Sequence, residues 1–191
     1  MLELHDVCFD YDQKKILDHL SISIGKGELV ALMGDSGIGK STLLNLIAGL
    51  RKPLHGVIKC DAQKITYAFQ EPRLFPWLTV LENILLVLQK DEKALQKAKE
   101  ALAFVSLEDC EALYPDELSG GMKSRVSLAR ALAHEGDLYL LDEPFSALDD
   151  SLRTRLATDL RQRFKKRGAS AILVTHLQSE AELFADRIIR L

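Results

Sequence analysis

The sequence has no long apolar run. Runs such as Ile84–Leu88 and Leu138–Leu141 fall far short of the roughly 18 apolar residues that a membrane-spanning helix needs. The first six residues also lack the basic start and apolar stretch of a secretory signal. We therefore expect a chain that does not cross a bilayer and that stays in the cytoplasm.

Cysteine is scarce, and the three residues present are far apart in the chain. Cys8, Cys60 and Cys110 fit neither a disulfide framework nor a Cys-x-x-Cys metal or redox pattern. We therefore expect reduced cysteines without a chemical role.

Internal repeats, low-complexity tracts and Gly/Ser linkers are absent too. With 191 residues, 47% hydrophobic and 28% charged residues and a net charge of −3, the composition is that of one globular domain and excludes a disordered or collagen-like chain. A basic excess lies at 161–167. It could form a nucleic-acid patch, but Leu152, Leu156, Leu160 and Phe164 recur every four residues, which favours the solvated face of an amphipathic helix.

Strand and helix patterns alternate along most of the chain. Residues 1–30 resemble antiparallel strands, and the continuous apolar run 29–33 predicts a strand buried on both faces, followed by a helix over 41–50. We expect the remaining elements as strands at 57–59, 65–69, 138–141 and 171–175 and helical segments over 80–105, 122–134 and about 151–166. This alternation predicts an α/β fold with a mainly parallel sheet.

The segment Gly34–Ser41 matches the pattern G-x-x-x-x-G-K-[ST] between a predicted strand and a predicted helix. Its glycines allow the backbone N–H groups to surround phosphate oxygens at a helix N-terminus. Lys40 is then expected to reach the β- and γ-phosphates, and the Ser41 hydroxyl to bind Mg²⁺. A glycine-rich turn that contains Lys-Ser by chance is the alternative, which the flanking strand and helix disfavour.

Two adjacent carboxylates end the strand expected at 138–141. Mg²⁺ prefers carboxylate, hydroxyl and phosphate oxygens, so Asp142 is its expected partner. Glu143 could orient a water for in-line attack on the γ-phosphate and accept its proton. Alone, the pair could also cap a turn; the phosphate loop in the same chain favours the catalytic interpretation.

The run Leu118–Met122 supplies a second Ser-Gly-Gly anion-binding pattern ahead of a helix. It resembles the LSGGQ signature of the ATP-binding-cassette (ABC) ATPases, with Met122 in place of the usual Gln. In that family, two cassettes pair head to tail, and the signature of one closes over the ATP held by the phosphate loop of the other.

Further landmarks of that family follow in order. Tyr11 matches the aromatic residue that stacks on adenine, Gln70 the Q-loop glutamine, 146–149 the D-loop and His176 the switch histidine. Taken singly, Tyr11 could be a surface turn residue, and Gln70 and His176 ordinary hydrogen-bonded polar residues. Leu177 stands where the family often has Asp.

The resemblance implies a complete set of site residues. Catalytic roles fall to Glu143, His176, Gln70 and Lys40, and Mg²⁺ binding to Ser41, Gln70 and Asp142. The nucleotide-binding set comprises Tyr11, Gly34, Asp35, Ser36, Gly37, Ile38, Gly39, Lys40, Ser41, Thr42, Ser119, Gly120, Gly121 and Asp149. The other histidines, His5, His19, His55 and His134, match no landmark, and we expect no role for them.

The resemblance also implies an architecture and partners. We expect a single ABC ATPase domain over 1–191: a P-loop NTPase core with a mainly parallel sheet, an N-terminal antiparallel β subdomain and a helical subdomain inserted at about 73–135. Its cofactors would be ATP and Mg²⁺. Its partners would be an ATP-dependent homodimer or second cassette, a transmembrane permease subunit and, indirectly, a solute-binding protein, without nucleic acid. It would lie on the cytoplasmic face of the inner or plasma membrane.

The loop around Phe75, Trp77 and Leu78 is a candidate partner surface, because family members dock the permease near the Q-loop; internal packing of these side chains is the alternative. The amino-acid sequence of this segment also resembles that of the cassettes of bacterial importers for nitrate, sulfonate and taurine. A cassette of an exporter or a cell-division complex would share every catalytic residue. Less favoured are a soluble cassette acting on nucleic acid or the ribosome, and a small-molecule kinase, which would not need the 118–121 pattern.

Overall fold

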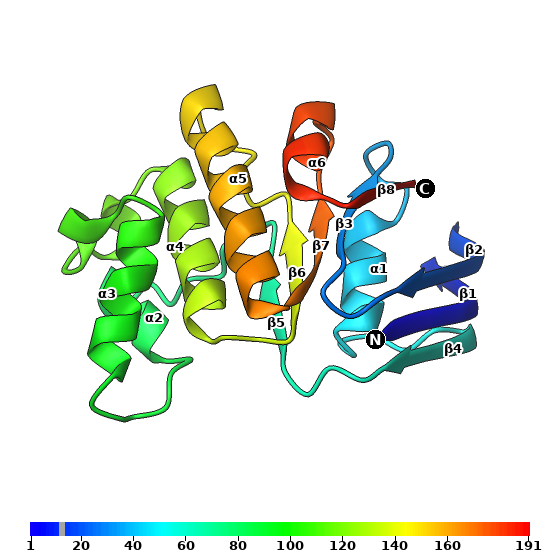
Figure 1. Ribbon diagram of the computed structural model, residues 1–191, viewed down its shortest axis with the longest axis horizontal. Helices are drawn as coiled ribbons and strands as arrows, with labels where there is room; N and C mark the ends of the chain where they lie inside the picture. Colours follow the sequence, from blue (N-terminus) through cyan, green and yellow to red (C-terminus); the bar gives the residue numbers. More distant parts are fainter. Residues whose placement is uncertain (12–13) are drawn as a thin grey trace.

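The centre of the molecule is a parallel sheet of five strands in the order β5-β6-β7-β3-β8 (Figure 1). The computed structural model describes residues 1–11 and 14–191. All four pairings within this sheet are parallel. Its strands are β3 (Leu29–Met33), β5 (Ile65–Ala68), β6 (Leu138–Asp142), β7 (Ser170–Val174) and β8 (Arg187–Arg190).

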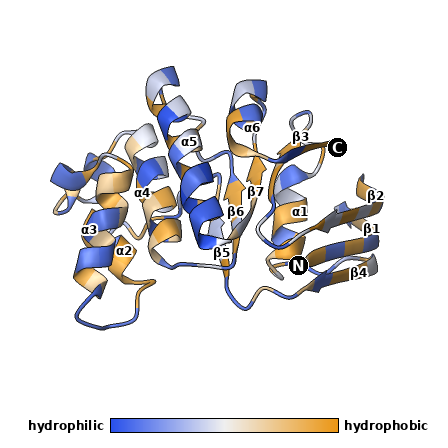
Figure 2. Cartoon of the chain, viewed as in Figure 1, coloured by the Kyte–Doolittle hydropathy of each residue, from blue (hydrophilic) through white to orange (hydrophobic). Residues whose placement is uncertain are grey.

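A second, antiparallel sheet of three strands has the order β2-β1-β4. Its strands are β1 (Leu2–Tyr11), β2 (Lys14–Ile24) and β4 (His55–Cys60). Figure 2 shows apolar and polar residues mixed along these strands, whereas the strands of the parallel sheet are mostly apolar. The antiparallel sheet therefore buries one face and leaves the other to solvent.

Helices cover both faces of the parallel sheet (Figure 1). The helix α1 (Lys40–Ile47) packs with the antiparallel sheet on one face, and α4, α5 and α6 lie over the other. The remaining helices are α2 (Val80–Leu85), α3 (Ala94–Phe104), α4 (Gly120–Ala133), α5 (Asp150–Arg167) and α6 (Gln178–Phe184), with short 3₁₀ turns at Glu108–Cys110 and Pro115–Glu117.

The strand β6 shows why these runs are apolar throughout. Leu138 and Leu140 pack into the core shared with α1 and the antiparallel sheet, while Tyr139 and Leu141 pack into the core under α4 and α5. Successive side chains of a strand point to opposite faces, so a strand covered on both sides has no position for a solvated residue. The expected α/β fold with a mainly parallel sheet is confirmed.

Several element boundaries differ from the predictions. The first helix ends at Ile47 rather than residue 50, because Gly49 adopts a left-handed φ of 72° and stops the helix. The helical pattern over 80–105 is broken into α2 and α3 by the connection 86–93, of which residues 89–93 are polar. The elements α6 and β8 were not predicted, since runs of seven and four residues carry too little periodicity.

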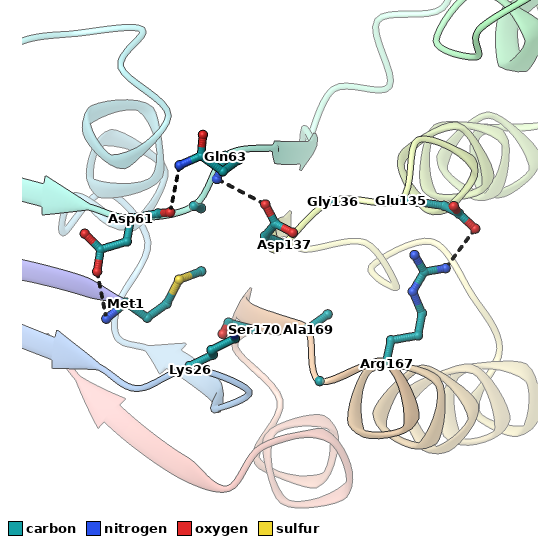
Figure 3. A pocket seen from close by; sticks show the side chains of 12 residues that line it. Met1, Lys26, Asp61, Gln63, Glu135, Gly136, Asp137, Arg167, Ala169 and Ser170 are labelled. Carbon is teal, nitrogen blue, oxygen red and sulfur yellow. Dashed lines mark hydrogen bonds and ion pairs between the residues drawn. The ribbon is translucent and has the colours of Figure 1, made fainter.

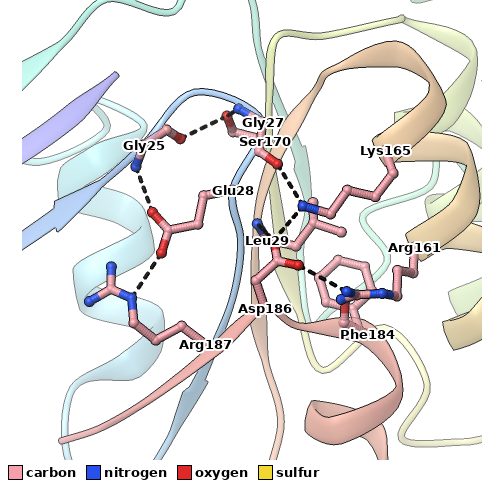
Figure 4. Close-up of polar contacts among 10 residues, drawn as sticks. All are labelled: Gly25, Gly27, Glu28, Leu29, Arg161, Lys165, Ser170, Phe184, Asp186 and Arg187. Carbon is pink, nitrogen blue, oxygen red and sulfur yellow. Dashed lines mark hydrogen bonds and ion pairs between the residues drawn. The ribbon is translucent and has the colours of Figure 1, made fainter.

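The basic stretch at the end of α5 is held in ion pairs (Figure 4). Arg161 and Lys165 both bind the carboxylate of Asp186, which also accepts a hydrogen bond from the backbone N–H of Leu29. Arg167 binds Glu135 at 2.9 Å. These contacts fasten α5 to the loop before β8 and agree with a solvated, ion-paired helix face.

Within residues 1–11 and 14–191, every helix is too short or too polar to traverse a membrane.

Candidate functional site

Several of the predicted site residues lie at the carboxyl edge of the parallel sheet. The loop 34–39 follows β3, Asp142 ends β6, and His176 follows β7 by two residues. In a parallel sheet these strand ends share one edge, which is where open α/β sheets bind their ligands.

The loop between β3 and α1 is shaped by glycine. Gly39 caps α1 with φ 111°, and a Cβ there would lie 2.8 Å from Cγ2 of Ile16. No other residue type fits both the backbone and the space. The loop curls around Lys40, whose ammonium donates to the carbonyls of Gly34 (2.8 Å) and Asp35 (2.9 Å). Lys40 is thus a nearly buried cation held at the N-terminus of a helix.

A cavity of about 390 Å³ opens beside this loop. It brings together residues from β1, β2, the phosphate loop, α1 and the ends of β5 and β6. Its lining residues are Tyr11, Ile16, Ser36, Gly37, Gly39, Lys40, Ser41, Thr42, Gln70 and Glu143. Nine of these ten were predicted from the sequence; Ile16 was not.

Asp142 is a buried carboxylate with an unused oxygen. Its residue is 3% exposed, and Oδ1 has no hydrogen-bond partner among the residues that the structure describes. The Tyr67 hydroxyl approaches Oδ2 at 3.5 Å. Burial raises the pKa of the Asp142 carboxyl and the charge of Glu143 raises it further, while the nearby side chains of Ser41 and Tyr67 lower it. A buried carboxylate oxygen without a partner is costly unless a cation binds it.

Glu143 and His176 face each other across the ends of β6 and β7. The Nδ1 of His176 lies 3.8 Å from Oε2 of Glu143, too far for a direct hydrogen bond and close enough for ion pairing if the imidazole is protonated. Glu143 adopts φ 47°, rare for a non-glycine residue, while its N–H donates to the carbonyl of Val174. This conformation turns the carboxylate toward the cavity.

The turn that carries His176 is fixed by Thr175. The Thr175 hydroxyl contacts the buried carboxyl of Glu180 and accepts a hydrogen bond from the N–H of Leu177 at 3.0 Å. Glu180 also pairs with Arg153 at 3.1 Å. These residues position the histidine without lining the cavity, and sequence analysis did not single them out.

Tyr11 lies at the cavity, as predicted. Its ring packs edge-on against Phe9, and the guanidinium of Arg51 lies 4.8 Å from the ring centroid. A planar base could stack on the ring only where Arg51 leaves a face open. The assignment of Tyr11 to adenine therefore stays a prediction.

Ser119, Gly120, Gly121 and Asp149 do not line the cavity. Ser119 caps α4, with its hydroxyl accepting from the N–H of Met122 at 3.3 Å, and Asp149 caps α5 in the same way through Leu152. A Cβ on Gly121 would lie 2.5 Å from the carbonyl oxygen of Ala147, so this glycine permits a close backbone approach. Figure 1 shows the start of α4 well apart from α1.

The donor set fits a nucleoside triphosphate with a hard divalent cation. The cavity combines backbone N–H groups, a buried ammonium, a serine hydroxyl and a carboxylate, and the unpaired Oδ1 of Asp142 lies near Ser41. Phosphate oxygens suit the first two groups, and Mg²⁺ suits the last two.

Sequence analysis missed Tyr67. This residue stacks on Phe69, with ring centroids 3.9 Å apart, and its hydroxyl points at Asp142. Burial and the charge of Asp142 raise the Tyr67 pKa, so the phenol stays a neutral donor. Nothing in the sequence pairs Tyr67 with a residue 75 positions away.

The segment 72–78 is held open toward solvent. Trp77 is 70% exposed and Phe75 41% exposed, so they are not packed internally. The side chain of Asn83 hydrogen-bonds the backbone of Phe75, Leu78 and Thr79. From α4, Arg130 donates to the carbonyls of Pro72 and Arg73.

A groove of about 430 Å³ adjoins this segment. Its lining is mostly apolar and includes Phe69, Phe75, Leu86 and Val87, with Arg73 and Arg130 at its polar positions. An exposed aromatic pair beside an apolar groove marks a surface suited to a protein partner.

Comparisons with known proteins agree with this geometry. Residues 17–146 match the family model described as ABC transporter. An aliphatic sulfonates import ATP-binding protein of Streptomyces avermitilis is 44% identical over 180 residues, covering 94% of this chain and 68% of that protein. Its counterpart from Bacillus subtilis is 46% identical over 169 residues, covering 84% and 66%. A sulfate/thiosulfate import ATP-binding protein of Chromobacterium violaceum is 42% identical over 201 residues, covering 98% and 55%. The chain thus spans from about half to two thirds of these relatives.

Solved structures give the same result. A dimeric bacterial ABC transporter cassette superposes with a TM-score of 0.93 at 32% identity, covering 100% of this chain and 94% of that one. A dimeric ATP-binding cassette in a post-hydrolysis state, bound to ADP and Pi, superposes with a TM-score of 0.92 at 32% identity.

Proposed function

This chain belongs to the ABC transporter family, and from that premise we propose that it is the ATP-binding, ATP-hydrolysing subunit of an ABC importer. The observation that carries the proposal is the buried Oδ1 of Asp142, which has no hydrogen-bond partner in the described part of the chain and lies beside Ser41, at the edge where the loop around Lys40 opens. A folded protein keeps such an uncompensated carboxylate where a ligand satisfies it.

In this proposal the phosphate loop binds the triphosphate through its N–H groups. Lys40 exchanges the carbonyls of Gly34 and Asp35 for phosphate oxygens. Ser41, Asp142 and Gln70 would hold Mg²⁺, which supplies charge neutralisation for the phosphates when bound. Tyr11 would contact the base.

Glu143 is the proposed general base. It lies at the cavity with its carboxylate 19% exposed, so a water that it contacts is close to the phosphates yet shielded from bulk solvent. Glu143 orients the water and accepts its proton, and His176, 3.8 Å away, responds to the γ-phosphate with Gln70. The Thr175–Glu180 contact keeps His176 oriented.

A second cassette is part of the proposed site. Ser119, Gly120, Gly121 and Asp149 cap helices away from the cavity of their own chain. A helix N-terminus with free N–H groups can complete an anion site on another copy. The dimeric state of similar cassettes supports this arrangement for a homodimer or a pair with a different cassette.

We propose the groove beside Phe75 and Trp77 as the docking surface for a transmembrane permease subunit on the cytoplasmic face of the membrane. Its apolar lining and the two exposed rings suit an amphipathic segment of a partner. The names of the relatives, which import sulfonates or sulfate, favour import over export and a small oxoanion or sulfonate as solute. A solute-binding protein would then act indirectly, through the permease.

The test uses the full chain and a matched pair of glutamate variants. Glu143→Gln is expected to hydrolyse ATP about 10²–10⁴-fold more slowly than the parent, because general-base catalysis is lost, while it still binds ATP. Glu135→Gln, on the opposite edge of the sheet, is the control and should keep parental turnover. Turnover is measured as phosphate release, and binding by equilibrium titration.

The same samples test the dimer. Light scattering after size exclusion, in the presence of ATP·Mg²⁺, should show Glu143→Gln as a dimer. The double variant that carries both Glu143→Gln and Ser119→Arg should be a monomer. Parental turnover in Glu143→Gln would disprove the assigned base, and a dimer unaffected by Ser119→Arg would disprove the role of α4 in it.

A further inference from the structure

The solvated face of the antiparallel sheet carries two backbone irregularities that lie opposite each other. In β1 and in β2, two consecutive residues are exposed, His5 with Asp6 and Asp18 with His19, which breaks the alternation of each strand. The register between the strands shifts between Leu4 and Phe9. Asp6 (φ 54°) and His19 (φ 49°) both adopt left-handed conformations. Such bulges re-aim side chains, and non-glycine residues there are strained.

The two bulges bring four functional groups together. The Nδ1 of His19 lies 2.7 Å from Oδ1 of Asp6, and its Nε2 lies 3.7 Å from Oδ1 of Asp18. The backbone N–H of His19 also donates to Sγ of Cys8 at 3.2 Å. Ligand atoms of Cys8, Asp18 and His19 all lie within 4.8 Å of one another.

These three residues supply the ligand types of a site for a late first-row transition metal. Thiolate, imidazole and carboxylate are the groups that bind Zn²⁺, at about 2.0–2.3 Å, so ligand atoms a few ångströms apart need only small side-chain movements. Three protein ligands leave a fourth position for water. Among the described residues, no other group of three such side chains is this close.

Asp6 supplies the second contact that metal-binding histidines usually have. If Nδ1 of His19 donates to Asp6, the lone pair of Nε2 is free and directed toward Asp18. Asp6 also contacts Nε2 of His55 at 3.1 Å, which anchors the carboxylate from β4. The three strands of the sheet thus contribute to one arrangement.

We propose that Cys8, Asp18 and His19 form a surface site for Zn²⁺ or a similar divalent transition metal, with Asp6 as the positioning residue. Binding releases the Cys8 thiol proton to solvent. The metal joins β1 to β2 three residues before Tyr11, so it stabilises the hairpin that carries this cavity residue. The proposal departs from the expectation that Cys8 and His19 have no chemical role, and it does not depend on the proposed ATPase function.

Lys15 provides an internal test of the site. Its ammonium lies 2.8 Å from Oδ1 of Asp18 and occupies the position that a metal would take beside this oxygen. Metal binding must displace it. Lys15→Ala is therefore expected to bind Zn²⁺ more tightly than the parent, and weaker binding would show that Asp18 is not a ligand.

The main experiment titrates the full, tag-free, nucleotide-free chain with Co²⁺ and then with Zn²⁺. Co²⁺ is expected to give one equivalent of near-ultraviolet thiolate charge-transfer absorption together with intense four-coordinate visible bands, and Zn²⁺ should displace both. Cys8→Ser should abolish the charge-transfer band. Cys60→Ser, a thiol outside the cluster, and His5→Ala, an exposed histidine outside it, are the matched controls and should titrate as the parent does.

The affinity series separates ligand from positioning residue. Zn²⁺ affinity, measured by competition with a chromophoric chelator, should fall about 10–100-fold in Asp6→Asn, as for loss of a residue that orients a metal-bound histidine. His19→Asn, which tolerates the left-handed conformation, should lose more. Far-ultraviolet circular dichroism reports that each variant is folded. The proposal is overturned by an unchanged band in Cys8→Ser, by parental affinity in His19→Asn, or by no binding in the folded parent.

Discussion

The two ends of β6 carry the same residue in opposite circumstances. Asp137, just before the strand, accepts two backbone hydrogen bonds at Oδ2, from Gln63 and Lys64, each at 3.0 Å. Asp142, which ends the strand, is 3% exposed and leaves Oδ1 without a partner among the described residues. One aspartate is bonded within the fold, whereas the other leaves an oxygen available for the Mg²⁺ that we propose.

The cavities at the two edges differ in the same way. The one at the amino edge is larger, about 510 Å³ against 390 Å³. Figure 3 shows its carboxylates in contact with partners: Asp61 with the amino group of Met1, Asp137 with Gln63, and Glu135 with Arg167. Unmet bonding capacity, rather than volume, distinguishes the functional edge.

The largest difference between the two edges of the sheet is expected in the effect of a lysine substitution on ATP affinity. Lys40→Ala should weaken ATP binding about 10²-fold or more, because two charge-assisted contacts of about 1.5–3 kcal/mol each are lost. Lys26→Ala, at the amino-edge cavity, should leave affinity unchanged. Equilibrium titration with ATP measures the affinity of each variant. Equal losses of affinity in the two variants would contradict the assignment of ATP binding to the carboxyl edge of the sheet.

The same substitution at the two ends of β6 should have opposite effects on stability. Asp142→Asn is expected to raise the free energy of unfolding of the nucleotide-free chain by about 1 kcal/mol, since it removes a buried, incompletely paired charge. It should abolish Mg²⁺-dependent hydrolysis. Asp137→Asn should lower stability by about 1 kcal/mol, because two charge-assisted bonds are weakened, and should leave hydrolysis intact. Denaturant unfolding of both variants checks the signs.

The pH dependence follows from the raised pKa of Asp142. Its folded pKa lies above the unfolded value, so the neutral carboxyl favours folding, and this contribution is lost as the pH rises through the folded pKa. The stability advantage of Asp142→Asn over the parent should therefore shrink as the pH falls from about 7.5 toward about 4, near the ordinary pKa of Asp. Unfolding curves at a series of pH values measure it, and a growing advantage at low pH would contradict the assignment.

The smallest effect on stability is expected from breaking the ion pair of Arg167 with Glu135 at the amino edge of the sheet. Arg167 donates a hydrogen bond to the Glu135 carboxylate and so lowers the pKa of that group, in an ion pair that is partly exposed to solvent. Such pairs contribute about 0–1 kcal/mol, so Arg167→Ala should cost no more than that and should leave ATP turnover unchanged. The cost should shrink as the pH falls below the unfolded pKa of Glu135 and vanish below its lowered folded pKa, where the carboxyl is neutral in both states. Thermal unfolding at neutral and acidic pH tests this.

The sequence was informative where chemistry is local. The phosphate loop, Asp142 with Glu143, and the apolar strands could be predicted because each is a contiguous pattern. The sequence could not tell that Asp137 is paired while Oδ1 of Asp142 has no partner among the described residues, since Gln63 and Lys64 lie 74 and 73 residues before Asp137 in the chain. It also could not join Cys8 to His19, because strand bulges leave no clear signature in the residues.

The helix α4 contacts the 72–78 segment through Arg130. The helix begins after the Ser119 cap. Eleven residues later, Arg130 donates hydrogen bonds to the carbonyls of Pro72 and Arg73, in the segment that also holds the exposed Trp77. At about 1.5 Å per residue these two points are roughly 16 Å apart on one stiff rod. The Ser119 cap and the loop that precedes Trp77 therefore lie at two points on one continuous helix, so α4 connects the two surfaces directly.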